Sequence, residues 1–376
     1  MTRQESTVPS THETGHAMML EGGRAHGGPF VSRFASIGNA LPETRLSTAD
    51  LMASTHHNTR VDLERLTGIR ERRVATAGEN SLTLALGAAQ DCVQRSDHEA
   101  ADLDMIISTS ITRFDDGLSQ RYEPPLSLAI KEALGAHRAI NFDLSNACSG
   151  MMTGVFILND FIRRGAIERG MVVSGEYISH LGTNAAKQVR SILSKQLASF
   201  TVGDAGAAVM LERAPQDAPG IEVAGFTTLS QHSRLCLGYP SRVGPGASMY
   251  TKARTIHKVA IEEFPALLRE ALDEDGIELG AIDYVIPHQT SVRAIKKGVQ
   301  DLGNRLGSPP KNVVVNVEDY GNTASTSHFV ALYRLLSEGQ FAPGDKVMLL
   351  SFGSGLEVGV VITVLDELLD RYGHHD

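Results

Sequence analysis

The sequence predicts an α/β fold whose central strands are largely parallel. Short apolar runs typical of buried strands alternate along the chain with segments whose apolar residues recur at helical spacing. Such alternation favours parallel pairing, because the chain must cross back over the sheet before each new strand begins. In sheets of this kind, reactive groups gather at the carboxyl ends of the strands.

The composition indicates either one large duplicated α/β unit or two domains. The chain has 376 residues, of which 42% are hydrophobic and 21% charged, and its net charge of −9 disfavours a nucleic-acid partner. Three cysteines without metal-ligand spacing suit a reducing compartment and predict no metal site. No apolar run approaches the roughly 20 residues of a membrane span, and the N-terminus lacks the apolar core of a signal peptide. We therefore expect a cytoplasmic enzyme.

The first half of the chain begins with a polar, glycine-rich stretch, residues 1–28, which predicts a mobile tail. Ser47 or Thr48 is a plausible N-cap for the first helix. The predicted strands are 29–40, 105–109, 139–142, 171–174 and 199–212, the last opening with a turn, and the predicted helices are 47–66, 80–93 and 124–134.

The second half repeats this rhythm. Its predicted strands are 220–228, 282–286, 313–317 and 346–351, and its predicted helices are 252–272, 291–302 and 326–337. Cys148 in the first half, and His288 and Ser354 in the second, all fall at the carboxyl ends of predicted strands. These three positions are therefore candidates for a shared site.

The central stretch, residues 139–170, places Cys148 where a strand turns into a helix. Apolar residues recur after it at helical spacing, and the helix is predicted to end at Arg163-Arg164-Gly165, with cations in its last turn and a glycine cap. The positive end of a helix favours thiolate, the nucleophilic form of cysteine. The alternative is a buried, inert cysteine.

Two later motifs favour a nucleophilic Cys148 over an inert, buried cysteine. His288 follows an apolar strand, and an imidazole can take a proton from a thiol or donate a hydrogen bond to a thioester oxygen. Asn322 precedes a helix, from which its amide can donate to an oxyanion. The loop 352–355, FGSG, can bring a backbone N–H close to a reacting carbonyl. Each feature is weak alone, but their order along the chain is specific.

In these motifs the chain resembles ketoacyl-acyl-carrier-protein synthase III enzymes of the thiolase superfamily over residues 29–366. The matching segments are DLSNACSG (143–150), GDAGAAVMLE (203–212), PHQTSVR (287–293), YGNTASTS (320–327) and SFGSG (351–355). The resemblance implies two pseudo-symmetric βαβαβαββ halves, residues 29–213 and 214–376, in a five-layered αβαβα arrangement, and a homodimer of such chains. No internal repeat is visible in the sequence.

The same resemblance implies the roles of the site residues. Cys148 would carry the acyl chain as a thioester, while His288 and Asn322 would polarise the carbonyl of the incoming thioester. The backbone amides of Cys148 and Ser354 would form the oxyanion hole. The substrates would be acyl thioesters of coenzyme A or of acyl carrier protein, with no further cofactor.

Further positions resemble the family's docking residues for these thioesters. The segment 68–73, GIRERR, supplies Arg70 and Arg72 near the predicted thioester entrance, and Arg293 falls where the family docks its carrier protein. Lys296 and Lys297 extend that basic face, which would steer an acidic carrier protein. The alternative for these cations is a solvated helix face.

The chain departs from the housekeeping members at two places around the entrance. It has no tryptophan, and Asp62 stands roughly where many members stack the coenzyme A adenine on one. Between Ser179 and Phe200 the chain is longer than the family norm, which would reshape the acyl tunnel or a dimer contact.

The sharpest departure is Glu123, which lies 25 residues before Cys148 at a position that is usually apolar. A glutamate there resembles the branch that joins two acyl thioesters: the head-to-head olefin-pathway enzymes and the pyrone and dialkylresorcinol synthases. It would act as a base at the partner subunit's site, since a carboxylate in a partly apolar tunnel is suited to remove an α-proton. The alternative is a glutamate that caps a helix beginning at Pro124.

The predicted function is therefore a Claisen condensation of two acyl or β-ketoacyl thioesters through acyl-Cys148, for a specialised lipid or aromatic product. Decarboxylative condensation with malonyl-acyl carrier protein is the nearest alternative. An acyltransferase to an alcohol or amine, or a non-catalytic subunit of a heterodimer, fits less well, because Cys148, His288 and Asn322 are all present.

Overall fold

The computed structural model describes residues 20–21, 28–57, 59 and 61–372. The first half builds a five-stranded sheet in the order β2-β8-β7-β5-β6, with antiparallel pairing on both sides of β8 and parallel pairing on both sides of β5. Its main elements in chain order are β2 (Val31–Ala40), α3 (Ser81–Gln94), β5 (Met105–Ser108), α4 (Leu126–Leu134), β6 (Ile140–Asp143), α5 (Gly150–Arg163), β7 (Arg169–Glu176) and β8 (Ala205–Ala214).

The second half repeats this topology, strand for strand. Its sheet runs β9-β15-β14-β12-β13, with the same sequence of antiparallel and parallel pairings. Its main elements are β9 (Ile221–Thr228), α7 (Ala253–Glu274), β12 (Tyr284–Pro287), α8 (Val292–Leu306), β13 (Asn312–Val313), α10 (Ser327–Ser337), β14 (Lys346–Gly353) and β15 (Glu357–Val364). Both halves are therefore βαβαβαββ units, as the resemblance implied, and the duplication is visible in the topology.

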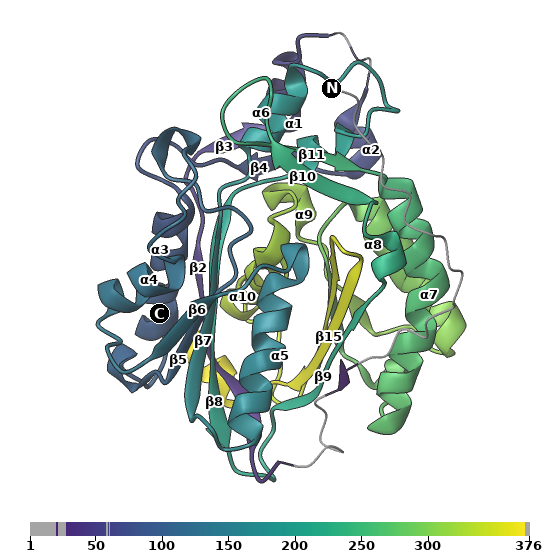
Figure 1. The fold of residues 1–376 in the computed structure, drawn as a ribbon. Helices are drawn as coiled ribbons and strands as arrows, with labels where there is room; N and C mark the ends of the chain where they lie inside the picture. The colour runs from purple at the N-terminus through teal and green to yellow at the C-terminus, as the bar shows by residue number, and fades with distance from the viewer. Residues whose placement is uncertain (1–19, 22–27, 58, 60, 373–376) are drawn as a thin grey trace.

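The two sheets and their helices form five layers (Figure 1). α3 and α4 cover the outer face of the first sheet, and α7 and α8 cover that of the second. α5 and α10 each contact strands of both sheets and so lie between them. The largest apolar cluster combines residues of α5, α10 and the inner faces of both sheets. The α/β thiolase fold and its αβαβα layering are confirmed.

α5 shows how the sequence pattern builds the central layer. The apolar residues at helical spacing, Met151, Val155, Leu158 and Ile162, are all fully buried. The helix ends at Arg163, and Gly165 follows in the left-handed conformation with φ 74°, as the glycine cap predicted. Because most residues of this helix are buried, its N-terminus is fixed in the middle of the molecule.

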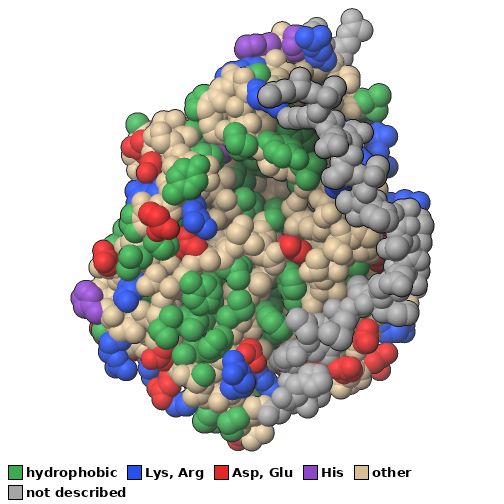
Figure 2. Space-filling view, in the orientation of Figure 1, with side chains coloured by type: hydrophobic (Ala, Val, Ile, Leu, Met, Phe, Trp, Pro, Cys, Tyr) green, Lys and Arg blue, Asp and Glu red, His purple; other side chains and the backbone are tan. Residues whose placement is uncertain are grey.

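Smaller elements sit above the layers, around the N-terminal ends of α5 and α10 (Figure 1). They include two antiparallel hairpins, β3 with β4 and β10 with β11. Their bounds are β3 (Arg45–Ser47), α1 (Thr48–Ala53), α2 (Leu63–Thr67), β4 (Glu71–Arg73), α6 (His180–Ala186), β10 (Cys236–Pro240), β11 (Ala247–Thr251) and α9 (Val317–Tyr320). Figure 2 shows a hollow on this face below them, rimmed by hydrophobic side chains.

Three predicted elements differ from the structure. The helix predicted over 47–66 is two helices: Ser47 caps α1 as expected, but the hydroxyls of Ser54 and Thr55 donate to the carbonyls of Leu51 and Met52 and end it. The strand predicted over 313–317 pairs only at Asn312–Val313. The run 139–142 is not a buried strand, because β6 lies at the edge of its sheet.

The predicted tail falls mostly outside the described residues. Within it, however, Leu20–Glu21 form β1, which pairs antiparallel with Phe226 and Gly225 of β9 and extends the second sheet to six strands. The segment 1–28 is therefore not a tail throughout.

Candidate active site

Cys148 lies in a strained turn at the start of α5. The 3-10 turn Ala147–Ser149 leads directly into the helix, and Ala147 has a left-handed φ of 46°. The second half repeats this device: Ala324, with φ 51°, begins the 3-10 turn Ala324–Thr326 that leads into α10. Left-handed alanine costs free energy and persists where the surrounding structure enforces it. The two turns pack against each other, so the internal duplication creates the site.

The β14–β15 hairpin closes one side of the Cys148 turn. A side chain at Gly353 would place its Cβ 2.6 Å from the Ser149 hydroxyl oxygen, so only glycine permits this approach. Ser354 follows in the hairpin turn, and its hydroxyl donates to the carbonyl of Cys236 at 2.7 Å. The hairpin thereby brings the backbone around Ser354 next to the nucleophile turn.

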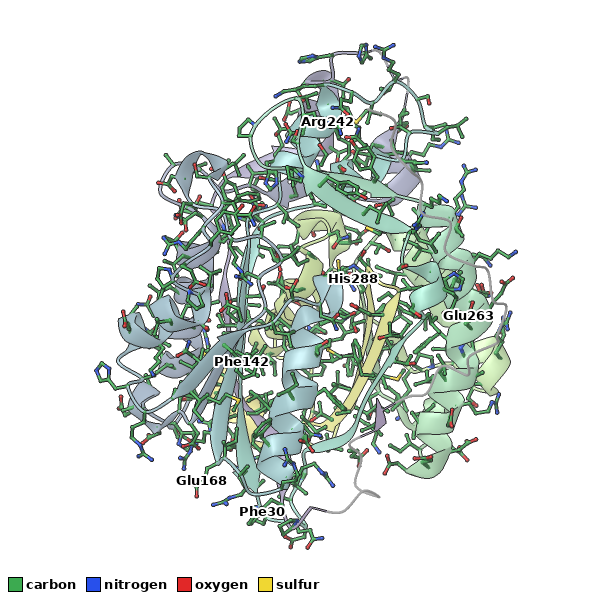
Figure 3. The ribbon with its side chains drawn as sticks, viewed as in Figure 1. Phe30, Phe142, Glu168, Arg242, Glu263 and His288 are labelled. Atoms are coloured by element: carbon green, nitrogen blue, oxygen red, sulfur yellow. The ribbon has the colours of Figure 1, made fainter. Side chains whose placement is uncertain are left out.

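His288 lies immediately after β12, and its backbone N–H donates to the carbonyl of Leu350 in β14 at 2.8 Å. Figure 3 shows it near the centre of the molecule. Its ring stacks on that of His328, with centroids 5.9 Å apart. Burial, reinforced by His328, lowers the pKa of His288 to about 3. His288 is therefore neutral at physiological pH and suited to hydrogen bonding rather than to holding a proton.

Gln289 holds His288 in place. Its amide NH₂ donates to the carbonyls of Pro287 and Val314, at 2.7 and 3.2 Å, and its oxygen accepts from the backbone N–H groups of Asn316 and Val317, at 2.7 and 3.1 Å. This fully bonded amide draws the chain after Val313 away from the sheet, which explains why β13 is shorter than predicted.

Asn322 is fixed by its own backbone and side chain. Its N–H donates to the carbonyl of Thr201 at 2.7 Å, and its carbonyl accepts from Gly203 at 3.1 Å. Its side-chain oxygen accepts from the N–H of Ala324 at 2.9 Å, which orients the amide. Because Val202 and Ala324 belong to the apolar cluster that also contacts Cys148, Asn322 borders the same space as the nucleophile.

The resting state of Cys148 differs from the thiolate that the helix end predicted. Burial raises the pKa of the Cys148 thiol, and the charges of Cys236, Glu176 and Glu357 add to this effect. A helix N-terminus is worth at most about 2 kcal/mol, whereas burial can shift a pKa by about 3–5 units. The effect of desolvation therefore exceeds that of the helix end, and Cys148 rests as a thiol.

Two acidic residues near this thiol were missed in the sequence analysis. Glu176, at the end of β7, is fully buried and accepts from the hydroxyls of Ser174 and Ser325, the latter in the turn Ala324–Thr326. Glu357, at the start of β15, is half-buried beside the Cys148 turn. Burial raises the pKa of each carboxyl group to about 7. A lone acid within an apolar run was the available signal in both cases.

Four of the five predicted docking cations lie on the surface at one place. Arg293, Lys296 and Lys297 are exposed on α8. α2 packs against the start of this helix, since a Cβ at Gly68 would lie 2.3 Å from the Val292 side chain, and Arg70 follows two residues later. The guanidinium of Arg70 donates to Asp319 at 2.5 Å, so part of its charge is already neutralised.

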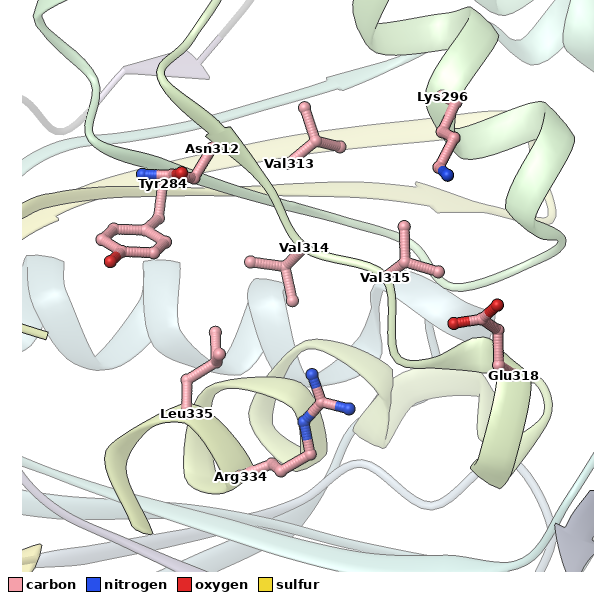
Figure 4. Close-up of a pocket in the computed structure, with 9 residues that line it drawn as sticks. All are labelled: Tyr284, Lys296, Asn312, Val313, Val314, Val315, Glu318, Arg334 and Leu335. Atoms are coloured by element: carbon pink, nitrogen blue, oxygen red, sulfur yellow. The ribbon is translucent and has the colours of Figure 1, made fainter. Parts of the chain in front are cut away.

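A surface pocket of about 360 Å³ adjoins this face (Figure 4). Figure 4 shows Lys296 and Glu318 at one end and Tyr284 at the other, with Arg334 on the helix below. Its lining residues are Tyr284, Lys296, Asn312, Val313, Val314, Val315, Glu318, Arg334 and Leu335. None of the four predicted catalytic residues, Cys148, His288, Asn322 and Glu123, is among them, so this pocket is not where the chemistry would occur.

Arg72, the fifth predicted docking cation, is buried with 1% of its surface exposed. Its guanidinium donates to the Thr48 hydroxyl at 3.0 Å and to the Phe200 carbonyl at 3.1 Å, and burial lowers its pKa to about 10. A side chain enclosed in this way cannot contact a carrier protein or coenzyme A. The prediction for Arg72 is wrong, and its role is to tie the loops beneath the entrance together.

Glu123 is exposed and does not cap the helix that follows it. α4 begins at Leu126, and Asp143 at the end of β6 accepts from the N–H groups of Leu126 and Ser127, at 3.1 and 2.9 Å. The capping alternative for Glu123 is therefore wrong. Asp143 therefore fastens the start of α4, three residues after Glu123, to the end of β6, the edge strand of the first sheet.

This arrangement predicts that substitution of Asp143 lowers the stability of the protein and that substitution of Glu123 does not. Asp143→Ala should lower the free energy of unfolding by about 1–2 kcal/mol, because two helix N–H groups lose their acceptor. Glu123→Gln should leave it unchanged within error, because its side chain caps nothing. Urea denaturation of both variants checks this, and a destabilised Glu123→Gln protein would contradict the assignment.

The remaining predicted features have simpler outcomes. Asp62 caps α2, its carboxylate accepting from the N–H of Arg65 at 3.0 Å. Within the described part of the chain, no cluster of three or more His, Cys, Asp or Glu side chains could hold a metal ion. No helix there combines the length and apolar composition needed to cross a membrane.

Comparison with known proteins identifies the class. Models of 3-oxoacyl-[acyl-carrier-protein] synthase III and of its C-terminal part match residues 142–231 and 272–365. The chain is 33% identical over 337 residues to β-ketoacyl-[acyl-carrier-protein] synthase III of Symbiobacterium thermophilum, covering 86% of this chain and 95% of the relative. It therefore belongs to the 3-oxoacyl-[acyl-carrier-protein] synthase III family, and it is a condensing acyltransferase.

Solved structures agree on the fold. The priming β-ketosynthase of the R1128 polyketide pathway matches with a TM-score of 0.76 and 27% identity, over 89% of this chain and 96% of that chain. A glutamate-to-alanine variant of OleA from Xanthomonas campestris matches with a TM-score of 0.78 and 22% identity, over 90% of this chain and 100% of that chain.

Proposed function

We propose that the protein joins two acyl or β-ketoacyl thioesters by a Claisen condensation that involves no decarboxylation. The observation that carries this proposal is Glu123, an exposed carboxylate that caps nothing and lies three residues before the start of α4, which Asp143 ties to the edge strand β6. The product is a β-ketoacyl thioester, or a diketone that cyclises, in a specialised lipid or aromatic pathway.

Cys148 receives the first acyl group as a thioester. The backbone N–H groups of Cys148 and Ser354 stabilise the oxyanion during this transfer, an arrangement supported by the packing of β14 against the Cys148 turn. His288, neutral and held by Gln289, and Asn322, oriented through Ala324, then donate hydrogen bonds to the carbonyl of the second thioester. These bonds stabilise the carbanion formed next to that carbonyl.

A homodimer brings the base to the site. β6 is paired on one side only, its Ile140 is 61% exposed, and Tyr122, in the segment before α4, is also exposed. Figure 2 shows hydrophobic side chains gathered over the middle of this face, and the partly buried Phe142, Phe156 and Phe161 come from β6 and α5. A second copy that pairs along β6 buries this surface and carries Glu123 across the interface.

The substrates arrive as coenzyme A or carrier-protein thioesters. Arg293, Lys296 and Lys297 on α8, with Arg70 beside them, form the docking face, since an acidic carrier protein is attracted to a local basic patch even on an enzyme of net negative charge. A cysteine-to-serine variant of the Xanthomonas OleA holds lauric acid and lauroyl-CoA, so this fold has room for a long acyl chain. No cofactor is needed beyond the thioesters.

Decarboxylative condensation with malonyl-acyl carrier protein is the second candidate. It is favoured by the names of the curated relatives and by the His288 and Asn322 pair, which can equally stabilise a carbanion formed by loss of carbon dioxide.

Deuterium at the α-carbon of the second substrate tests the proposal. The enzyme is acylated with unlabelled lauroyl-CoA and then supplied with α-dideuterated lauroyl-CoA, and the product is analysed by mass spectrometry. We expect both chains in the product, with one deuterium lost at the new bond and a primary isotope effect on the condensation rate. An absence of product with this pair and with other acyl-CoA pairs, while malonyl thioester is used, would reject the proposal in favour of decarboxylative synthesis.

A further inference from the structure

We infer that Glu357 is a proton-transferring residue of the Cys148 site: it accepts the thiol proton when Cys148 is acylated and returns it when the acyl group leaves. This inference rests on the proposed use of an acyl-Cys148 intermediate, but not on how the second thioester forms its carbanion.

The hairpin places the Glu357 carboxyl group against the nucleophile turn. A Cβ at Gly353 would lie 3.1 Å from Glu357 Oε2 and 2.6 Å from the Ser149 hydroxyl, so the carboxyl group borders the residue that follows Cys148. On its other side it faces the amide of Asn146, two residues before Cys148, at 2.5 Å from both carboxyl oxygens. The charge of Glu357 also reaches the thiol, since it is one of those that raise the pKa of Cys148.

The surroundings of Glu357 suit both of its protonation states. When it is ionised, the Asn146 NH₂ donates to both carboxylate oxygens, and the Asn146 oxygen accepts from the Thr153 hydroxyl at 2.7 Å. When it is protonated, it donates to the Asn146 oxygen, while the Asn146 NH₂ donates to Thr153 and the Thr153 hydroxyl donates to the Ser149 carbonyl at 2.9 Å. Rotation of the Asn146 amide and of the Thr153 hydroxyl converts one arrangement into the other. In both arrangements the Glu357 carboxyl group is hydrogen-bonded.

The other neighbours of Cys148 are poorer proton acceptors. His288 has a pKa of about 3 and so releases a proton readily. Glu176 shares the raised pKa of about 7, but it is fully buried behind Ser325 and already accepts from two hydroxyls and a backbone N–H. Glu357 is half-buried, and burial brings its pKa to about 7, near the value at which a group best accepts and returns protons.

The proton transfers balance over one catalytic cycle. In acylation, the Cys148 proton passes to the Glu357 carboxylate, the sulfur bonds to the acyl carbon, and the departing thiolate of the donor takes a proton from water. In condensation, Glu123 takes the α-proton of the second thioester and passes it to the hydroxide left from acylation. The resulting carbanion bonds to the acyl carbon, the bond from Cys148 to that carbon breaks, and Glu357 returns its proton to the sulfur. Cys148 and Glu357 are then in their starting states.

Single-turnover acylation tests this role apart from condensation. Wild-type enzyme and Glu357→Gln are mixed with acetyl-, octanoyl- or lauroyl-CoA from about pH 5 to about pH 9. The reactions are quenched in acid, and the fraction of acyl-Cys148 is measured by intact-mass spectrometry. Because the carboxylate is the active form, the wild-type rate should rise with pH through about 7 and then level off. Glu357→Gln should acylate about 100-fold more slowly or worse, without that inflection. Glu338→Gln, the same change at an exposed site on α10's end, should match the wild type.

Each outcome has a distinct meaning. A folded Glu357→Gln protein that keeps the wild-type rate and inflection would overturn the inference, and Glu357 would serve only to hold Asn146. If melting curves show that this variant does not fold, Glu357→Asp decides: we expect slower acylation with a displaced inflection, and a profile identical to wild type would overturn the role. Wild-type enzyme that forms no acyl-Cys148 with any donor would instead reject the proposed function.

Discussion

Cys148→Ala should form no acyl-enzyme and should lose at least about 10³-fold of its condensing activity, because no other thiol lies at the start of α5 in the described structure. The change removes one sulfur atom from a half-buried site, so the fold should survive. Intact-mass measurement after incubation with lauroyl-CoA checks the first point, and product analysis checks the second.

Cys236→Ala is the matched control for this variant. Cys236 lies close enough for its charge to raise the pKa of Cys148, and its Sγ is 3.4 Å from the Thr251 hydroxyl, but it does not stand at a helix N-terminus. We expect this variant to keep the acyl mass shift. Acylated Cys148→Ala protein would show that the acyl group resides elsewhere and would remove the basis of the mechanism.

Glu123→Gln should retain acylation but lose about 10²–10⁴-fold in condensation, the usual contribution of a general base. Acylation survives because it takes place at Cys148, whereas carbanion formation requires the carboxylate. Separate assays of acyl-enzyme formation and of product release distinguish the two steps. A variant that loses both to the same extent would indicate a structural role for Glu123.

Mixing the two inactive variants tests whether Glu123 acts across the interface. Cys148→Ala and Glu123→Gln proteins are unfolded and refolded together, so that subunits reassort at random. Half of the dimers are then mixed, and one of the two sites in each mixed dimer combines an intact Cys148 with an intact Glu123 from the other subunit. About a quarter of wild-type activity should return. No recovery, with mixed dimers present, would place the base in the same subunit or elsewhere.

The fold was predictable from the sequence wherever burial alone shapes the pattern. The four apolar residues of α5 that recur at helical spacing are all buried, and the alternation of strands and helices gave the α/β class. The pattern failed where side chains redirect the backbone: Ser54 and Thr55 end α1, and Gln289 shortens β13 by binding Asn316 and Val317. Such polar contacts produce no periodic pattern in the amino-acid sequence.

The apolar run of β6 shows a second limit. Its residues predicted a buried strand, but the structure places the strand at a sheet edge with Ile140 exposed. An apolar pattern in the sequence predicts that a surface is covered. It does not show whether the same chain or a partner covers it.

The positions of the proposed site residues could be predicted in part, because these residues follow strands or begin helices. Cys148, His288 and Asn322 stand at such positions, and the topology brings their turns together. Arg72 shows the limit of this reasoning, since a basic motif does not reveal which of its side chains is enclosed by Thr48 and Phe200. Glu357 shows the converse, because it comes close to Asn146 only through the β14–β15 hairpin.

Release of carbon dioxide during condensation is the most direct test of the proposed condensation without decarboxylation. The enzyme is incubated with an acyl thioester and malonyl thioester labelled at its free carboxyl group, and then, separately, with a second acyl or β-ketoacyl thioester. We predict no labelled carbon dioxide from the first mixture and condensed product from the second. Label released in stoichiometric amounts with chain extension would contradict the account and assign decarboxylative synthesis to the Cys148 site.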